Sequence, residues 1–328
     1  MKQINNILLL GLCLSFTLSA QQSQFDKQLQ QIVKSEMQAN AKKILPAPAS
    51  TINDYDIKYH RCQWQADPAV NFIRGAITTY FKPLVSALDT IRFNLSDALS
   101  VDSVRYHQGL IPFSHPTGNI VIIPFSVAVS QNVLDSVTVY YHGIPASTGF
   151  GSFIQSEHDS IPIIWTLSEP FGASDWWPCK NGLTDKADSI DVIVITPSAY
   201  SAASNGVLVS EIVNGPNKIC HWKHRYPIAT YLICFAVTNY VHYSDWVPFG
   251  SAPPLEVLNY VFPEDSASVV TQTPSVIPVM QLYDTLFGIY PFQKEKYGHA
   301  QFGWGGGMEH QTMTFMGGFS HGLIAHEL

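Results

Sequence analysis

The residues with the clearest chemical potential lie near the end of the chain. Residues 303–310 read Gly-Trp-Gly-Gly-Gly-Met-Glu-His, and residues 326 and 327 are His-Glu. Three consecutive glycines let a backbone approach a ligand without interference from Cβ atoms. His-Glu is also the first half of H-E-x-x-H, in which two histidines one helical turn apart bind zinc and the glutamate between them acts on the metal's water. These types and spacings suggest a ligand-binding strand followed by a metal-binding helix.

The sequence stops before this motif is complete. Leu328 is the last residue, and the second histidine would fall two positions beyond it. A single histidine cannot hold a catalytic zinc ion, because such sites use three protein ligands. We therefore expect the chain as it stands to be an incomplete and inactive fragment.

A third segment far upstream completes the pattern. Residues 167–179 read Leu-Ser-Glu-Pro-Phe-Gly-Ala-Ser-Asp-Trp-Trp-Pro-Cys. Taken alone, Glu169 is an acid before a proline and the glycines are a flexible turn. Together, residues 167–179, 306–310 and 326–328 resemble three motifs of the aminopeptidase N-like family of zinc metallopeptidases, which includes membrane alanyl aminopeptidases and leukotriene hydrolases. The motifs occur in the family's order, and the resemblance runs from about residue 55 onward.

The resemblance implies roles for four ionisable side chains. His326 would be one ligand of a single zinc ion, and Glu327 would be the catalytic residue that polarises the metal-bound water. Glu309 and Glu169 would together bind the α-ammonium group of the substrate. The partner would then be a peptide with a free N-terminus, because an internal peptide bond offers no ammonium group to the two acids.

The glycine-rich segment would complete the substrate site. Gly306, Gly307 and Met308 would bind the substrate, with the two glycines lying alongside its backbone in strand fashion. His310 stands where most relatives have asparagine; both side chains can donate a hydrogen bond, so we expect altered detail and not lost function. Leu167 stands where relatives often have glutamine, which would change the polarity of the pocket.

Composition bounds the class of protein. The chain has 328 residues, of which 46% are hydrophobic and 13% charged, with a formal net charge of -7. It is long enough for two domains and a sizeable core. No run of Lys or Arg occurs, so nucleic acid is excluded as a partner, because phosphate affinity depends on clustered cations.

The first 50 residues predict an export signal and a connecting segment. Lys2 precedes an apolar run at 7–18 and small residues at 19–20, so residues 1–20 read as a cleaved signal peptide. The expected location is periplasmic or extracellular, with no transmembrane segment after cleavage. Residues 21–50 predict a helix over 23–44 and a Pro/Ala linker. Four cysteines remain outside the signal, either in disulfides or as buried free thiols.

Fold class follows from periodicity. Residues 51–245 form short segments rich in Val, Ile, Tyr and Phe between turn residues, which predicts a mainly β, antiparallel sandwich or saddle-type domain. The expected strands are 57–64, 76–81, 91–95, 120–129, 137–141, 161–167, 191–196 and 231–237. Residues 246–328, with a strand at 255–261 and a helix at 275–287, predict the truncated start of an α/β catalytic domain. The family resemblance implies that this domain is thermolysin-like.

Two other functions fit parts of the pattern. A non-catalytic secreted β-sandwich could bind peptides or glycans on a platform of four tryptophans: Trp64, Trp165, Trp176 and Trp177. An endopeptidase could share the metal helix, but it would gain nothing from two acids that bind an ammonium group. His221 and His224 are three residues apart, and without a third ligand nearby we interpret them as residues of a strand surface.

Overall fold

The structure, a computed structural model, describes residues 52–148, 151–250 and 253–328, and in addition residues 26, 27, 29, 30, 32–34 and 37. The predicted signal at 1–20 and the linker at 46–50 lie outside these ranges. The described residues between 26 and 37 are helical, and Ile32 packs against the hydrophobic cluster around helix α3 (Val276–Phe287). Within the described ranges, no helix has the length and apolar character needed to cross a membrane.

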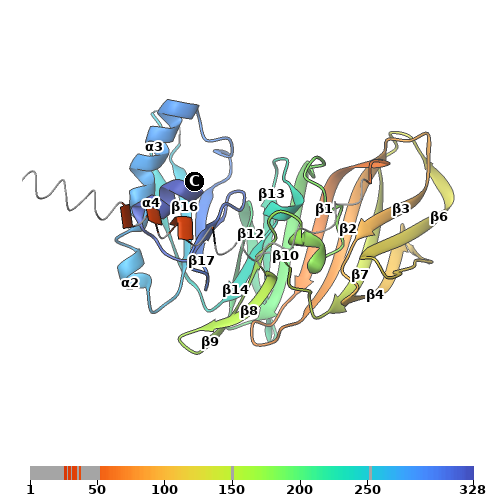
Figure 1. Cartoon of the computed structure of the whole chain (residues 1–328), viewed down its shortest axis with the longest axis horizontal. Helices are drawn as coiled ribbons and strands as arrows, with labels where there is room; N and C mark the ends of the chain where they lie inside the picture. The colour runs from red at the N-terminus through yellow and green to blue at the C-terminus, as the bar shows by residue number, and fades with distance from the viewer. Residues whose placement is uncertain are drawn as a thin grey trace, which may run out of the picture.

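The first part of the chain is built of strands, which confirms the predicted fold class (Figure 1). An eight-stranded sheet has the order β12-β13-β10-β1-β2-β7-β4-β5, a four-stranded sheet the order β11-β14-β9-β8, and β3 pairs with β6. The pairing is antiparallel except between β1 and β10, which run parallel. The strands are β1 (Tyr55–Gln65), β2 (Ile73–Pro83), β3 (Ala87–Asn94), β4 (Leu99–Tyr106), β5 (Gly109–Ile111), β6 (Ile120–Ser130), β7 (Asp135–Gly143), β8 (Ser152–His158), β9 (Ile161–Leu167), β10 (Ser189–Pro197), β11 (Ser201–Ser204), β12 (Val207–Asn214), β13 (Asn217–His224) and β14 (Phe235–Thr238).

Large aromatic side chains fill the space between these sheets. Trp64 of β1 lies with its ring centroid 4.8 Å from that of Trp176 and 5.4 Å from that of Phe235. Trp64, Trp165, Trp176 and Trp177 are all at most 4% exposed. The tryptophan platform that the binding alternative requires is therefore wrong, because these rings have no free surface for a ligand.

The second part is a mixed sheet covered on one face by helices (Figure 1). Its order is β15-β16-β17-β19-β18, with β16, β17 and β19 parallel. The elements are β15 (Val241–Val247), β16 (Leu255–Val261), α2 (Ser266–Val269), η3 (Thr273–Ser275), α3 (Val276–Phe287), β17 (Tyr297–Gln301), β18 (Gly307–Met308), β19 (Thr314–Met316) and α4 (His321–Glu327). The strand predicted at 255–261 and the helix predicted at 275–287 are confirmed.

Each face of this mixed sheet meets a different hydrophobic cluster. Val257, Met280 and Ile324 belong to the cluster under α3 and α4. Tyr260 and Phe315 belong instead to the cluster that fills the β-rich part. The five-stranded sheet is therefore the layer that joins the helices to the first three sheets.

One predicted strand is misplaced, and one new strand crosses a proposed boundary. Residues predicted as a strand at 231–237 begin with a 3₁₀ turn, η2 (Thr230–Leu232), before β14 starts. Asn205 explains the turn, because its side chain donates to the Leu232 carbonyl and accepts from the Cys234 amide, both at 2.9 Å. The division proposed at 245/246 lies inside β15, which pairs along its whole length with β16.

The four cysteines of the described ranges, Cys62, Cys179, Cys220 and Cys234, are all buried and free. Of the two states that the sequence leaves open, the structure therefore contains buried thiols. Burial raises the pKa of each thiol, which disfavours the reactive thiolate.

Candidate active site

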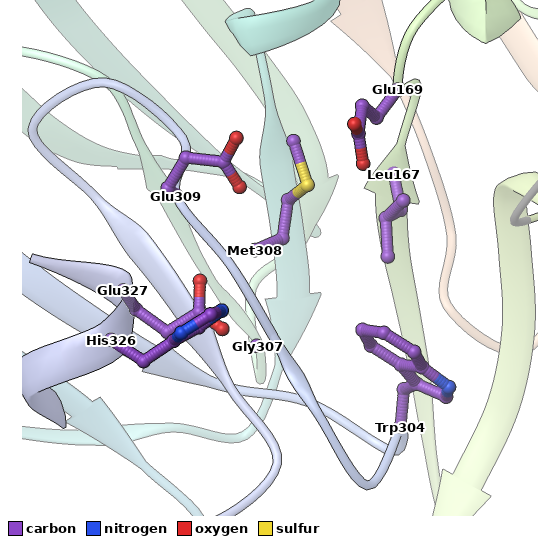
Figure 2. A pocket seen from close by; sticks show the side chains of 8 residues that line it. All are labelled: Leu167, Glu169, Trp304, Gly307, Met308, Glu309, His326 and Glu327. Carbon is purple, nitrogen blue, oxygen red and sulfur yellow. The ribbon is translucent and has the colours of Figure 1, made fainter. Parts of the chain in front are cut away.

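A cavity of about 290 Å³ lies where the β-rich part meets the mixed sheet. Figure 2 shows the side chains that line it: Leu167, Glu169, Trp304, Gly307, Met308, Glu309, His326 and Glu327. Six of the seven candidate site residues from the sequence are among them. The seventh, Gly306, is adjacent in the chain and buried, but it does not line the cavity.

Two short elements of the mixed sheet position one side of the cavity. Strand β18 is the edge strand of its sheet, pairing only through Gly307 and Met308 with β19. Helix α4 packs against β18. It begins at Ser320, whose hydroxyl accepts from the Leu323 amide at 3.3 Å. Near its other end, the Tyr283 hydroxyl donates to the Ala325 carbonyl at 2.7 Å, which ties α4 to α3.

The Glu327 side chain lies directly over Gly307. A Cβ atom at Gly307 would come closer than 3.0 Å to the carboxyl group of Glu327. A Cβ atom at Gly306 would lie 2.7 Å from the ring of Trp304. These two glycines therefore make room for side chains of the protein itself, a requirement that the sequence interpretation did not include. Gly305, in contrast, has no neighbour within 4 Å of its Cβ position.

Replacing Gly307 by alanine is expected to displace Glu327. The added methyl group overlaps a buried carboxyl group, and overpacking of this kind costs about 1–3 kcal/mol of stability. Gly305→Ala is the matched control, because its Cβ would point into open space. Urea unfolding of both variants checks this; equal stabilities would contradict the packing described here.

The turn that carries Glu169 is fixed by its neighbours. Ser168 accepts a hydrogen bond from the Trp176 indole nitrogen at 2.9 Å, and its carbonyl accepts from the Gly172 amide at 2.8 Å. A few residues on, the Asp175 carboxylate accepts from the Ser152 hydroxyl at 2.5 Å. The half-buried Glu169 is thus held in place by its own turn.

The loop after Glu309 is anchored to the β-rich part. Thr312 accepts from the Gly206 amide at 2.7 Å, and the Asn205 side chain donates to the Gln311 carbonyl at 2.8 Å. The Gln311 side chain also lies 2.7 Å from Nε2 of His224. Glu169 and Glu309 are therefore positioned by the same β-rich scaffold, although they are 140 residues apart.

His224 is fully buried, so its interpretation as a strand-surface residue is wrong. Its Nδ1 atom lies 2.5 Å from a carboxylate oxygen of Glu295, whose side chain is 2% exposed. The Arg225 amide donates to the other oxygen of Glu295 at 2.7 Å. The pair joins β13 to the segment before β17. No local pattern predicts this pair, because it joins residues 71 positions apart.

Tyr231 is a residue near the two acids that sequence reasoning missed. Its pKa is raised by burial and, in addition, by the negative charges of Glu309 and Glu169. Two carboxylates can act on one phenol only when both lie near it. Tyr231 therefore lies near both Glu169 and Glu309. The sequence does not reveal this proximity, because Tyr231 is far along the chain from both acids.

His310 differs in detail from the asparagine of most relatives, as expected. Its side chain could donate a hydrogen bond, yet within the described residues neither ring nitrogen has a hydrogen-bond partner. Its ring instead packs on Phe315, with 4.4 Å between centroids. Burial lowers the pKa of His310 to about 3, so the ring is neutral and adds no positive charge beside Glu309.

Lys296 lies beneath the same loop in an unusual state for a lysine. It is 1% exposed, and its Nζ donates to the Thr312 carbonyl at 2.7 Å. Nζ also lies 5.3 Å from the centroid of the Trp222 ring. Burial lowers the pKa of Lys296 to about 7.

Stability is expected to rise with pH because of Lys296. The unfolded chain keeps this proton up to about pH 10.5, whereas the folded chain releases it above about pH 7. The unfolded state therefore binds more protons between these values, and the free energy of unfolding gains up to about 1.4 kcal/mol per pH unit. Urea titrations between pH 7 and 9 should show this slope, and Lys296→Met should lack it. Lys294→Met, at an exposed position, is the control and should keep it.

The cavity supplies only part of a zinc site. Within the described ranges, no group of three or more His, Cys, Asp or Glu side chains could hold a metal ion. His326 is an exposed imidazole at the cavity and the one candidate ligand from the sequence. A catalytic zinc site needs two further protein ligands, so the described residues do not by themselves fit the ion.

Comparison with known proteins places the fold. A scan against protein-family models and a search of curated proteins found no match. Among solved structures, the chain resembles the M1 zinc metallopeptidase from Deinococcus radiodurans, with a TM-score of 0.70 and 19% identity over 80% of this chain and 60% of that one. It also resembles a mutant of a two-domain M1 zinc metallopeptidase bound to L-tryptophan, with a TM-score of 0.72 and 18% identity.

These similarities concern architecture. The match to the two-domain enzyme covers 84% of this chain and 65% of that one, so the chain spans about three fifths of the length of the solved structures. A mutant of the Deinococcus radiodurans enzyme has also been solved with a Tyr-Ser-Ala substrate, with a TM-score of 0.68 and 18% identity to this chain. The β-rich part followed by a mixed α/β sheet is the fold of M1 zinc metallopeptidases.

Proposed function

We propose that this chain carries the part of a zinc aminopeptidase active site that recognises the amino terminus of a peptide. The observation that carries the proposal is that Glu169, from the turn after β9, and Glu309, from the loop after β18, line one cavity with His326 and Glu327. Two carboxylates at one end of a cavity favour a cation there. An α-ammonium group is the cation that distinguishes a peptide end from a peptide interior.

The edge strand supports the same assignment. Gly307 and Met308 pair with β19 on one side, and β18 is the last strand of its sheet. An extended peptide can add to such an edge through main-chain hydrogen bonds. A peptide aligned on β18 would pass the cavity, with its amino end near Glu309 and its first carbonyl group near His326 and Glu327.

The described residues account for recognition and not for bond cleavage. His326 would be one zinc ligand and Glu327 the residue that polarises the metal-bound water, as the resemblance implies, but the remaining ligands would have to come from outside the described residues. We assign no step of hydrolysis to this chain alone. Export to the periplasm or the cell exterior also belongs to this proposal, as does the division of the chain into a β-rich domain and a catalytic domain.

Binding of small amides tests the proposal. L-Alaninamide should bind the chain at least tenfold more tightly than N-acetyl-L-alaninamide, because acetylation removes the positive charge. Chelator should leave this difference unchanged, because Glu169 and Glu309 act without a metal ion. Equal affinities for the two amides, measured by titration calorimetry, would refute the ammonium site.

Cleavage is tested separately, in protein expressed from the complete reading frame. That protein should hydrolyse aminoacyl amides, leave N-acetylated amides intact, and lose activity with a chelator. Activity that persists in the presence of the chelator would refute the zinc peptidase assignment. Cleavage of acetylated and free substrates at equal rates would favour the endopeptidase alternative.

A further inference from the structure

We infer that Leu167 and Trp304 form an apolar wall that selects peptides whose first residue has an uncharged, apolar side chain. The inference rests on the proposed function, since it assumes that Glu169 and Glu309 hold the peptide's ammonium group. It adds the chemical class of the first side chain and the residues that choose it.

Apart from Glu169 at its end, one flank of the cavity is lined by apolar side chains. Figure 2 shows Glu309 and Glu169 facing each other at one end, and His326 with Glu327 along one flank. Leu167 and Trp304 lie along the opposite flank, with Met308 between the two sides.

The substituents of the first Cα atom are thereby assigned. The amino group is taken by the two acids, and the carbonyl group lies toward the flank of His326 and Glu327. The remaining substituent is the side chain, and the flank left for it is that of Leu167 and Trp304. A polar side chain placed there would lose its hydrogen bonds to water without gaining others, whereas an apolar one gains by leaving water.

The wall is formed before any ligand binds. Leu167 is buried at the end of β9, and Met308 is buried in β18. The ring of Trp304 lies over Gly306. The main-chain carbonyl oxygen of Trp304 occupies the space that a Cβ atom of Gly317 would need. The ring also lies edge-on to Phe302, with 6.0 Å between centroids. A rigid wall of this kind discriminates by polarity without paying for rearrangement.

Substitution of Leu167 tests the apolar wall most directly. It follows Thr166 and precedes the Glu169 turn, so its side chain lies on the same strand end as one of the two acids. Replacing it by glutamine adds an amide that can bond a polar ligand. Leu167→Met is the matched control, because methionine is as long as glutamine but keeps the apolar character of leucine.

Four amides of similar or related shape test the inference on the full chain by titration calorimetry. L-Leucinamide against N-acetyl-L-leucinamide measures the ammonium site, and L-leucinamide against L-glutaminamide measures the wall. We expect at least a tenfold preference in each comparison. L-Alaninamide should bind more weakly than L-leucinamide, because it covers less of the wall.

The variants distinguish the apolar wall from the ammonium site. Leu167→Gln and Trp304→Ala should bring the leucine-to-glutamine preference to threefold or less, while the preference for the free amine stays. Leu167→Met should keep both preferences. A wild-type chain that prefers the free amine but binds the leucine and glutamine amides equally would overturn the apolar wall and leave the ammonium site standing. Loss of the preference for the free amine itself would overturn both; neither result requires a variant to fold.

Discussion

Replacing both Glu169 and Glu309 by glutamine is expected to abolish the preference for a free amino group. Each substitution alone should cost about tenfold in affinity for L-alaninamide, because it removes one of two charges that face the ammonium group. The loss is moderate because Glu309 is exposed and Glu169 half-buried, so water screens both charges. Binding of N-acetyl-L-alaninamide should stay unchanged.

Titration calorimetry of the single and double variants measures this effect. Glu157→Gln is the control, since Glu157 is an exposed acid on β8 outside this cavity. Affinity should also weaken with added salt, as expected for an exposed charge pair. If the double variant still prefers the free amine tenfold, the two acids do not form the ammonium site.

The largest expected effect on stability comes from His224→Ala. This change leaves the buried Glu295 carboxylate with the Arg225 amide but without its imidazole hydrogen bond, and losing a hydrogen bond to a buried charged group costs about 1.5–3 kcal/mol, to which the cavity left by the ring adds. His221→Ala, on the same strand, is the matched control. Its ring is 31% exposed, and Asp191 keeps the Lys223 ammonium group at 2.6 Å, so the expected cost is about 1 kcal/mol or less.

Urea unfolding of both histidine variants distinguishes these costs, provided that the dependence on urea keeps the same slope. Equal losses would mean that the buried pair contributes no more than a surface pair. Because Gln311 contacts His224 in the loop after Glu309, the His224 variant should also weaken amide binding, whereas the His221 variant should not.

The parts of the fold that depend on local pattern were predictable from the sequence. Alternating burial in β1, and apolar spacing followed by Gly288 at the end of α3, are features of consecutive residues. The order of the three motifs also placed Glu169, Glu309 and His326 correctly at one cavity. Their roles in binding and catalysis remain predictions.

The remainder depends on contacts between distant segments. His224 meets Glu295, Tyr231 lies near both acids, and Trp304 sits over Gly306, and none of these relations leaves a periodic signal in the sequence. The strand predicted at 231–237 failed for the same reason, because the side chain of Asn205 converts its first residues into a turn. The packing of His310 on Phe315, which leaves both ring nitrogens without a partner among the described residues, was not predictable for the same reason.

The single cluster that runs from Trp64 to Phe315 has a consequence for how the chain denatures. Because Tyr260, Phe302 and Phe315 are buried against the β-rich part, melting either part first would expose aromatic surface on the other. Heating should therefore produce one calorimetric transition, whose van't Hoff and measured enthalpies agree. A protein cleaved between residues 245 and 246, inside β15, should yield two fragments that expose apolar surface and aggregate when separated.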